Sequence, residues 1–199
     1  MWPTILLHAW RHLVLSIDAL STAVLAGTAL GLLAWAVRPA RTTVLALAAI
    51  GRTVPSIALL MLLIPVFGIG TLPAVVALAL LALPPIVVNV EVALRAVSPA
   101  VLDAATGLGM TPFQRFARVS VPLALPVALS GLRTASVEVI GSATLATFIG
   151  AGGLGDDIVR ALQTGDVPLL LAAAATVAFL AFAAEFLLAR LAHYVEVAL

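Results

Sequence analysis

The residues of this chain best suited to contact another molecule lie in one short polar segment between long apolar runs. Within residues 98–122, here called the elbow, Arg115 and Arg118 stand close to the aromatic residues Phe113 and Phe116. Arginine side chains are costly to bury in hydrocarbon, and a spacing of three puts both aromatic rings on one face of a helix. Aromatic residues on a short helix outside the membrane fit a groove on a partner protein. The elbow is therefore predicted to be a docking surface.

The first half of the elbow has the signals of a short helix that stops at glycine. Ser98 can cap the helix with its hydroxyl group, and Pro99 suits the first helical position. Gly107 or Gly109 can end the helix, because glycine readily adopts the left-handed conformation of a C-terminal cap. We therefore expect a helix from about Ser98 that ends in a tight turn.

The second half of the elbow is predicted to open another helix at Thr111. Pro112 follows in the first helical position, and Gln114 stands three residues after Thr111, as in a capping box. The alternative is an ordinary amphipathic loop helix that lies on the membrane surface. The aromatic pair favours the docking interpretation over that alternative.

Other kinds of chemistry find little support in the residue types. Cysteine is absent, so the chain has no thiol nucleophile, disulfide or cysteine metal site. A serine nucleophile would need a histidine base within reach, but every histidine lies at the end of an apolar run: His8, His12 and His193. The net charge of +1 argues against nucleic acid as a partner. We therefore expect neither an enzyme nor a metal site.

A glycine-rich segment from Gly150 to Gly155 matches the dinucleotide pattern G-x-G-x-x-G. That pattern indicates a nucleotide site only when it follows a strand within a βαβ unit, and here it follows a long apolar run. We interpret it as a compact loop on the outer side, where Asp156 and Asp157 stabilise the start of a short helix toward Leu162. The chain has no lysine and hence no P-loop, so ATP would have to be hydrolysed by another chain.

Long apolar runs must position these segments. Hydrophobic residues make up 63% of the 199 residues and charged residues 10%, against about 25% charged residues in soluble domains. About 20 apolar residues can cross a bilayer as a helix. Five such runs are present, near 13–37, 43–67, 72–94, 123–148 and 167–190. We therefore predict an all-α membrane protein, a five-span helical bundle that forms a single transmembrane domain over 1–199.

The arginines predict how the bundle sits in the membrane. Six of them flank the runs on one side: Arg38, Arg41, Arg95, Arg115, Arg118 and Arg190. The opposite side has two, Arg11 and Arg160. Because cytoplasmic loops carry the excess of basic residues, we predict an outer N-terminus, a cytoplasmic C-terminus and a cytoplasmic loop over 95–122.

Charged residues inside the apolar runs are costly and are therefore candidates for function. Glu91 and Arg95 are four residues apart, which predicts an ion pair along one helix. Arg133 and Glu138 diverge by about 140° on a helix, so we do not expect them to pair with each other. We hypothesise that Glu138 lines a pore or meets an arginine of another helix.

Several spaced motifs allow a comparison with a known family. In the elbow, Asp103-Ala104-Ala105 is followed by Gly109 and by Val119-Ser120-Val121-Pro122. This pattern resembles the EAA loop of permease subunits in binding-protein-dependent ABC importers, although that family usually has glutamate at the position of Asp103. Other segments resemble the osmoprotectant branch of type I importers, which imports glycine betaine, carnitine or choline: Thr53–Leu60, Ile64-Pro65, Gly68–Gly70, Gly131–Ala135 and Ile149–Asp156.

The resemblance implies a pore-forming subunit in the bacterial cytoplasmic membrane. Its partners would be a second permease subunit, two cytoplasmic ATPase subunits that bind ATP and Mg, and an extracytoplasmic binding protein; no cofactor is implied for this chain. The elbow would be the coupling loop that docks on the ATPase. Its implied coupling residues are Asp103, Ala104, Ala105, Gly109, Thr111, Pro112, Phe113, Gln114, Arg115, Phe116 and Arg118.

The spans also offer candidates for a pore or gate. Prolines interrupt the second and third spans and can bend them: Pro55, Pro84 and Pro85. Aromatic residues and glycines near the outer ends are gate candidates: Phe67, Phe148, Gly152 and Gly153. Glu138 completes this predicted pore set.

The solute stays open at this stage. The main interpretation is a compatible solute such as glycine betaine, choline or carnitine, and the alternative is methionine or another amino acid-like solute. A secondary carrier or an intramembrane enzyme is a remote alternative. Aromatic residues do not cluster within the spans, so an aromatic cage for a quaternary ammonium group is expected in the binding protein.

Overall fold

The computed structural model describes residues 2–197, so Met1 and 198–199 of the predicted 1–199 domain lie outside the described residues. All regular structure within residues 2–197 is helical, as predicted. The elements are α1 (Trp2–Ala36), α2 (Arg38–Gly51), α3 (Ser56–Phe67), α4 (Thr71–Arg95), α5 (Pro99–Gly107), α6 (Pro112–Arg115), the π-helical η1 (Phe116–Ser120), α7 (Val121–Ser142), the 3-10 helix η2 (Ala143–Ile149), α8 (Leu154–Thr164) and α9 (Val167–Val197).

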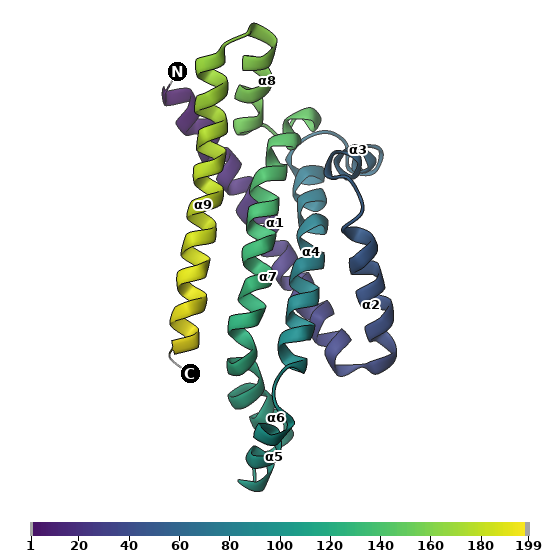
Figure 1. The fold of residues 1–199 in the computed structure, drawn as a ribbon. Coiled ribbons are helices and arrows are strands. Elements are labelled where there is room, and N and C mark those ends of the chain that lie inside the picture. Colours follow the sequence, from purple (N-terminus) through teal and green to yellow (C-terminus); the bar gives the residue numbers. More distant parts are fainter. Residues whose placement is uncertain (1, 198–199) are drawn as a thin grey trace.

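Helix α4 is the centre of the bundle. It packs most extensively against α1 and α7, and α2 and α3 also contact it; α9 covers α7, and α8 packs on α9 (Figure 1). Small residues permit this close packing: a Cβ atom added to Gly31 would lie 2.7 Å from the Cβ of Val90, and one added to Gly131 would lie 2.6 Å from the backbone oxygen of Pro85. Glycine therefore brings α1 and α7 against the two sides of α4.

The predicted second span, 43–67, is not one continuous helix. It consists of α2 and α3, which meet at an angle of 103° across the residues between Gly51 and Ser56. Pro55 explains the break, because proline lacks an amide hydrogen and forces the preceding residue out of the helical conformation. Four helices are long and apolar enough to cross a membrane alone: Thr4–Ala36, Thr71–Arg95, Pro112–Ile149 and Val167–Val197. A count of five spans requires the bent pair to be the fifth.

The elbow and the glycine-rich loop from Gly150 to Gly155 lie at opposite ends of the bundle. The start of α1, helix α3 and helix α8 are at one end, and α5 and α6 project from the other (Figure 1). At the α8 end, the amide of Gly70 donates to the backbone oxygen of Ile149 at 2.8 Å and joins the loop after α3 to the end of η2. The elbow and the glycine-rich loop are thus separated by the full length of the bundle.

Candidate functional site

The turn that closes the first helix of the elbow is built around Gly109. Its φ is +79°, in the left-handed region that favours glycine. The amide of Gly109 donates to the oxygen of Thr106 at 2.9 Å, and the amide of Met110 donates to the oxygen of Ala105 at 3.2 Å. These two bonds form a Schellman motif. The predicted glycine cap is therefore present, at Gly109 rather than at Gly107.

Helix α6 begins with the predicted capping box. The amide of Thr111 donates to Oε1 of Gln114 at 2.9 Å, and the amide of Gln114 donates to Oγ1 of Thr111 at 3.3 Å. The equivalent prediction for α5 is wrong, because the Ser98 side chain makes no capping bond. Only its backbone oxygen accepts, from the amides of Val101 and Leu102.

The elbow joins α7 through an unusual helical turn. After α6 the chain forms the π-helical turn η1 and then enters α7, so that Pro112–Ile149 runs as one helical segment. The amide of Val121 donates to the oxygen of Phe116, five residues back. Pro122 has no amide hydrogen to offer in this region, and single π turns commonly mark functional positions in helices. The elbow and α7 therefore belong to one helical segment, with a π turn between them.

Two side-chain contacts brace the elbow. Nη1 of Arg115 donates to Oγ1 of Thr106 at 2.6 Å and ties α6 to α5. The ring of Phe116 stacks on Trp35 at the end of α1, with ring centroids 5.4 Å apart and an interplanar angle of 29°. The prediction that Phe113 and Phe116 are exposed together is therefore wrong: Phe113 is 77% exposed, whereas Phe116 is half-buried. The π turn and the Trp35 ring direct Phe116 inward.

The outer surface of the elbow combines apolar and charged side chains. Ala105 is buried, whereas Asp103, Ala104, Gly109, Thr111, Pro112, Phe113 and Arg118 are exposed. Sequence reasoning missed Leu108, which is 80% exposed and was signalled only by its position between two glycines. Within residues 2–197 the Asp103 carboxylate has no hydrogen bond or ion pair. This surface therefore offers two large apolar groups flanked by one anion and one cation.

The predicted pore residues separate into an exposed and a buried set. Pro55, Phe67, Glu138 and Phe148 are exposed. Pro84 and Pro85 are buried inside α4, which continues through both of them. Gly152 and Gly153 have positive φ values of 78° and 95°, and a Cβ added to Gly153 would lie 3.3 Å from Nδ1 of His12. The two glycines are thus explained by the shape of the loop.

Arginines bind the acidic residues Glu91 and Glu185 of the long helices. The predicted pair of Glu91 and Arg95 is confirmed, with Nε of Arg95 donating to Oε1 of Glu91 at 2.5 Å. Arg41 of α2 donates to the same oxygen at 2.6 Å. Arg133 does not pair with Glu138, as predicted, and instead donates through Nε to Glu185 of α9 at 3.0 Å. Sequence reasoning missed both partners, since they are 50 and 52 residues away.

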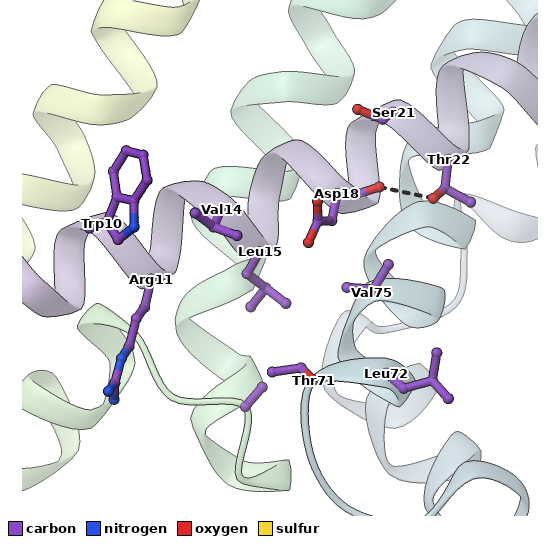
Figure 2. A pocket seen from close by; sticks show the side chains of 11 residues that line it. Trp10, Arg11, Val14, Leu15, Asp18, Ser21, Thr22, Thr71, Leu72 and Val75 are labelled. Carbon is purple, nitrogen blue, oxygen red and sulfur yellow. Dashed lines mark hydrogen bonds between the residues drawn. The ribbon is translucent and has the colours of Figure 1, made fainter.

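The α8 end carries a second polar arrangement. Nδ1 of His8 lies 2.7 Å from Oδ2 of Asp157, whose side chain is buried, so the start of α1 is linked to α8. Along α1 from this pair, a cavity of about 830 Å³ lies between α1 and the start of α4. Arg11, Asp18 and Thr71 are among its lining residues, and Figure 2 shows that Arg11 and Trp10 point away from each other on α1.

The features described so far are helices that can span a membrane, a structured polar elbow at one end and a glycine-rich loop at the other. In a comparison with protein families, the family described as "Binding-protein-dependent transport system inner membrane component" matches residues 22–197. The chain belongs to this family. It is a permease subunit, not an enzyme, and a multi-pass protein of the inner membrane.

Curated relatives cover nearly the whole permease. It is 42% identical over 187 residues to the osmoprotectant import permease protein OsmW of Salmonella typhimurium, covering 92% of this chain and 87% of the relative. It is 36% identical to the carnitine transport permease protein OpuCB of Listeria monocytogenes, over 95% and 87% of the two chains. It is also 36% identical to the choline transport system permease protein OpuBB of Bacillus subtilis, over 93% and 85%.

Solved structures give the same fold. The permease matches a chain of the MetNI methionine ABC transporter in an inward-facing conformation with a TM-score of 0.85 and 26% identity, covering 98% of this chain and 97% of that one. A chain of an amino acid ABC transporter solved with histidines matches with a TM-score of 0.80 and 21% identity, over 96% and 94% of the two chains. The permease therefore has the fold of an ABC importer permease.

Proposed function

We propose that this permease forms the pore of an ATP-driven importer for a compatible solute that carries a quaternary ammonium group, such as glycine betaine, carnitine or choline. The observation that carries the proposal is the similarity to permeases named for osmoprotectant, carnitine and choline transport, at 36–42% identity over more than 90% of the chain. Its partners would be a second permease subunit, two ATPase subunits that bind ATP and Mg, and an extracytoplasmic binding protein.

The elbow is the proposed contact with the ATPase. Its support is physical: α5 and α6 project from one end of the bundle (Figure 1), Phe113 and Leu108 are exposed at 77% and 80%, and the π turn η1 joins this surface to α7. A rigid apolar surface at the end of a long helix can convert the movement of a partner into movement of that helix. In this proposal the elbow and the C-terminus are cytoplasmic and the N-terminus lies outside, which follows from the arginine distribution.

A methionine or other amino acid-like solute is the second candidate, because the MetNI methionine transporter chain superposes with a TM-score of 0.85. The sequences favour the first candidate, since 26% identity to that chain is below the 42% identity to the osmoprotectant permease.

Uptake into proteoliposomes tests the proposal. The permease would be reconstituted with its ATPase and binding protein, and labelled glycine betaine, carnitine, choline and methionine would be offered in parallel, with and without ATP inside. We expect ATP-dependent uptake of one or more quaternary amines. Uptake of methionine alone would support the second candidate, and uptake that ignores ATP would contradict the importer assignment for this chain.

A further inference from the structure

The break between α2 and α3 exposes polar groups in the middle of an otherwise apolar segment. Arg52, Thr53 and Pro55 are all exposed, and the chain turns by 103° across them. Non-helical backbone at membrane depth is tolerated only where protein buries it or where it lines a water-filled cavity. Arg52 adds a full charge to this requirement. The break therefore lies either against a partner subunit or on a water-filled face of the assembled importer, and the Arg52 charge favours the water-filled face.

The break and the middle of α7 flank the same point of α4. A Cβ added to Gly51 would lie 3.2 Å from Cγ of Pro84, and one added to Gly131 would lie 2.6 Å from the oxygen of Pro85. Helix α2 is thus seated on one side of the proline pair and α7 on the other. The three helices lie side by side, with α4 between α7 and α2 (Figure 1).

Glu138 lies on the α4-facing side of α7. It follows Gly131 by seven residues, which is two helical turns and within about 20° of the same direction. Gly131 is in close contact with α4, yet Glu138 is exposed, because it lies beside the exposed Val137 and Gly141 at the edge of the buried face of α7. Its carboxylate therefore opens onto the same face as the break.

The two charges are available to a ligand. Among the described residues, neither Arg52 nor Glu138 has a hydrogen bond or an ion pair, although the Arg52 charge attracts the Glu138 carboxylate. Glu91 and Glu185, by contrast, are both bound to arginines. An unpaired carboxylate on a membrane-spanning helix is expensive. A ligand that meets both charges would lower that cost during its passage.

We propose that Arg52 and Glu138 form a binding station for zwitterionic solutes, in which the Arg52 guanidinium holds the solute's carboxylate and Glu138 attracts its quaternary ammonium group. The inference rests on the proposed function and adds a specificity to it. Glycine betaine and carnitine carry both charges, whereas choline carries only the cation. Arg52 should therefore help the zwitterions alone, and Glu138 should help all three solutes.

The test is competitive uptake in the proteoliposomes described above, with glycine betaine and choline labelled differently. We expect Arg52→Gln to lower glycine betaine uptake roughly tenfold, the loss that follows removal of a charge-assisted hydrogen bond, and to leave choline uptake within about twofold. Glu138→Gln should lower both uptakes by a similar factor. Arg38→Gln and Glu196→Gln, which alter exposed charges at the ends of α2 and α9, are the matched controls and should change neither.

For the Arg52 variants, the ratio of glycine betaine uptake to choline uptake makes the result independent of how much protein assembles, whereas Glu138→Gln is compared as uptake per amount of assembled importer. If Arg52→Gln does not assemble, Arg52→Lys replaces it. An ammonium group cannot form the bidentate hydrogen bonds that a guanidinium makes to a carboxylate, so the ratio of glycine betaine uptake to choline uptake should fall, by a smaller factor. An unchanged ratio of glycine betaine uptake to choline uptake in the Arg52 variants would overturn the station. Unchanged choline uptake in Glu138→Gln would also overturn it. A wild-type protein that imports no quaternary amine would instead overturn the proposed function, and the station with it.

Discussion

Nε of Arg41 lies 2.6 Å from Oε1 of Glu91, so that the first turn of α2 is bound to the last turns of α4. Arg95 donates to the same oxygen from within α4. The Glu91 side chain is only 1% exposed, while the two arginines are 44% and 43% exposed. One buried carboxylate thus holds two cations that would otherwise repel each other at the elbow end of the bundle.

Replacement of Glu91 by glutamine should destabilise the permease in detergent. The variant loses the anion and leaves Arg41 and Arg95 facing each other, which we expect to cost about 2 kcal/mol after allowance for their exposure. The thermal unfolding midpoint is the measurement. Arg41→Gln should cost less, since Arg95 still pairs with Glu91. A thermal midpoint for Glu91→Gln equal to that of the wild type would show that the buried carboxylate does not stabilise the permease.

A charge exchange tests the link between α7 and α9. Arg133 donates two hydrogen bonds to Oε1 of Glu185. Arg133→Glu should lower the thermal midpoint because two carboxylates then face each other, and the double exchange Arg133→Glu with Glu185→Arg should restore part of the loss. Failure of the double variant to recover would show that the pair does not hold the two helices together.

The two aromatic residues of the elbow should have separable effects. Phe113→Ala removes an exposed ring and should leave the thermal midpoint unchanged while reducing the amount of ATPase that co-purifies with the permease. Phe116→Ala removes the stacking on Trp35. It should lower the free energy of unfolding by about 1–3 kcal/mol and therefore lower the thermal midpoint. The docking assignment fails if Phe113→Ala retains the ATPase as firmly as the wild type does.

The two glycines of the elbow provide a matched pair. Gly109→Ala places a side chain at φ +79°, which costs about 1–2 kcal/mol, and should distort the turn between α5 and α6. Gly107→Ala adds the same methyl group at the end of α5, where nothing lies within 4 Å of it, and should be neutral. ATP-dependent uptake should therefore fall for the first variant only. Equal uptake by both variants would mean that the shape of this turn is irrelevant to transport.

The elbow could be predicted from sequence because its signals are local. The capping box of Thr111 and Gln114 and the cap at Gly109 depend on residues within a few positions of each other. The stacking of Phe116 on Trp35 and the pairing of Arg133 with Glu185 depend on how distant helices pack, and no periodicity encodes that. Patterns of neighbouring residues therefore predicted the backbone turns and caps of the elbow, but not its contact with α1.

The effect of each proline on its span could not be predicted from the local sequence either. Pro65, Pro84, Pro85 and Pro126 all lie inside continuous helices, whereas Pro55 separates two. The apolar run over 43–67 conceals this break, because composition is the same on both sides of it. Whether a proline ends a helix here depends on packing between helices, which is not visible in a single run of residues.

Helix α1 links the two ends of the bundle independently of α7. At one end Trp35 bears on Phe116 of the elbow, and near the other His8 is held by Asp157 of α8. Both residues lie on a single helix of 35 residues, which is about 52 Å long at 1.5 Å per residue. The elbow is therefore joined to the α8 end by two routes, through α7 and through α1. If the elbow docks on the ATPase as proposed, both routes would carry its movement to the glycine-rich loop.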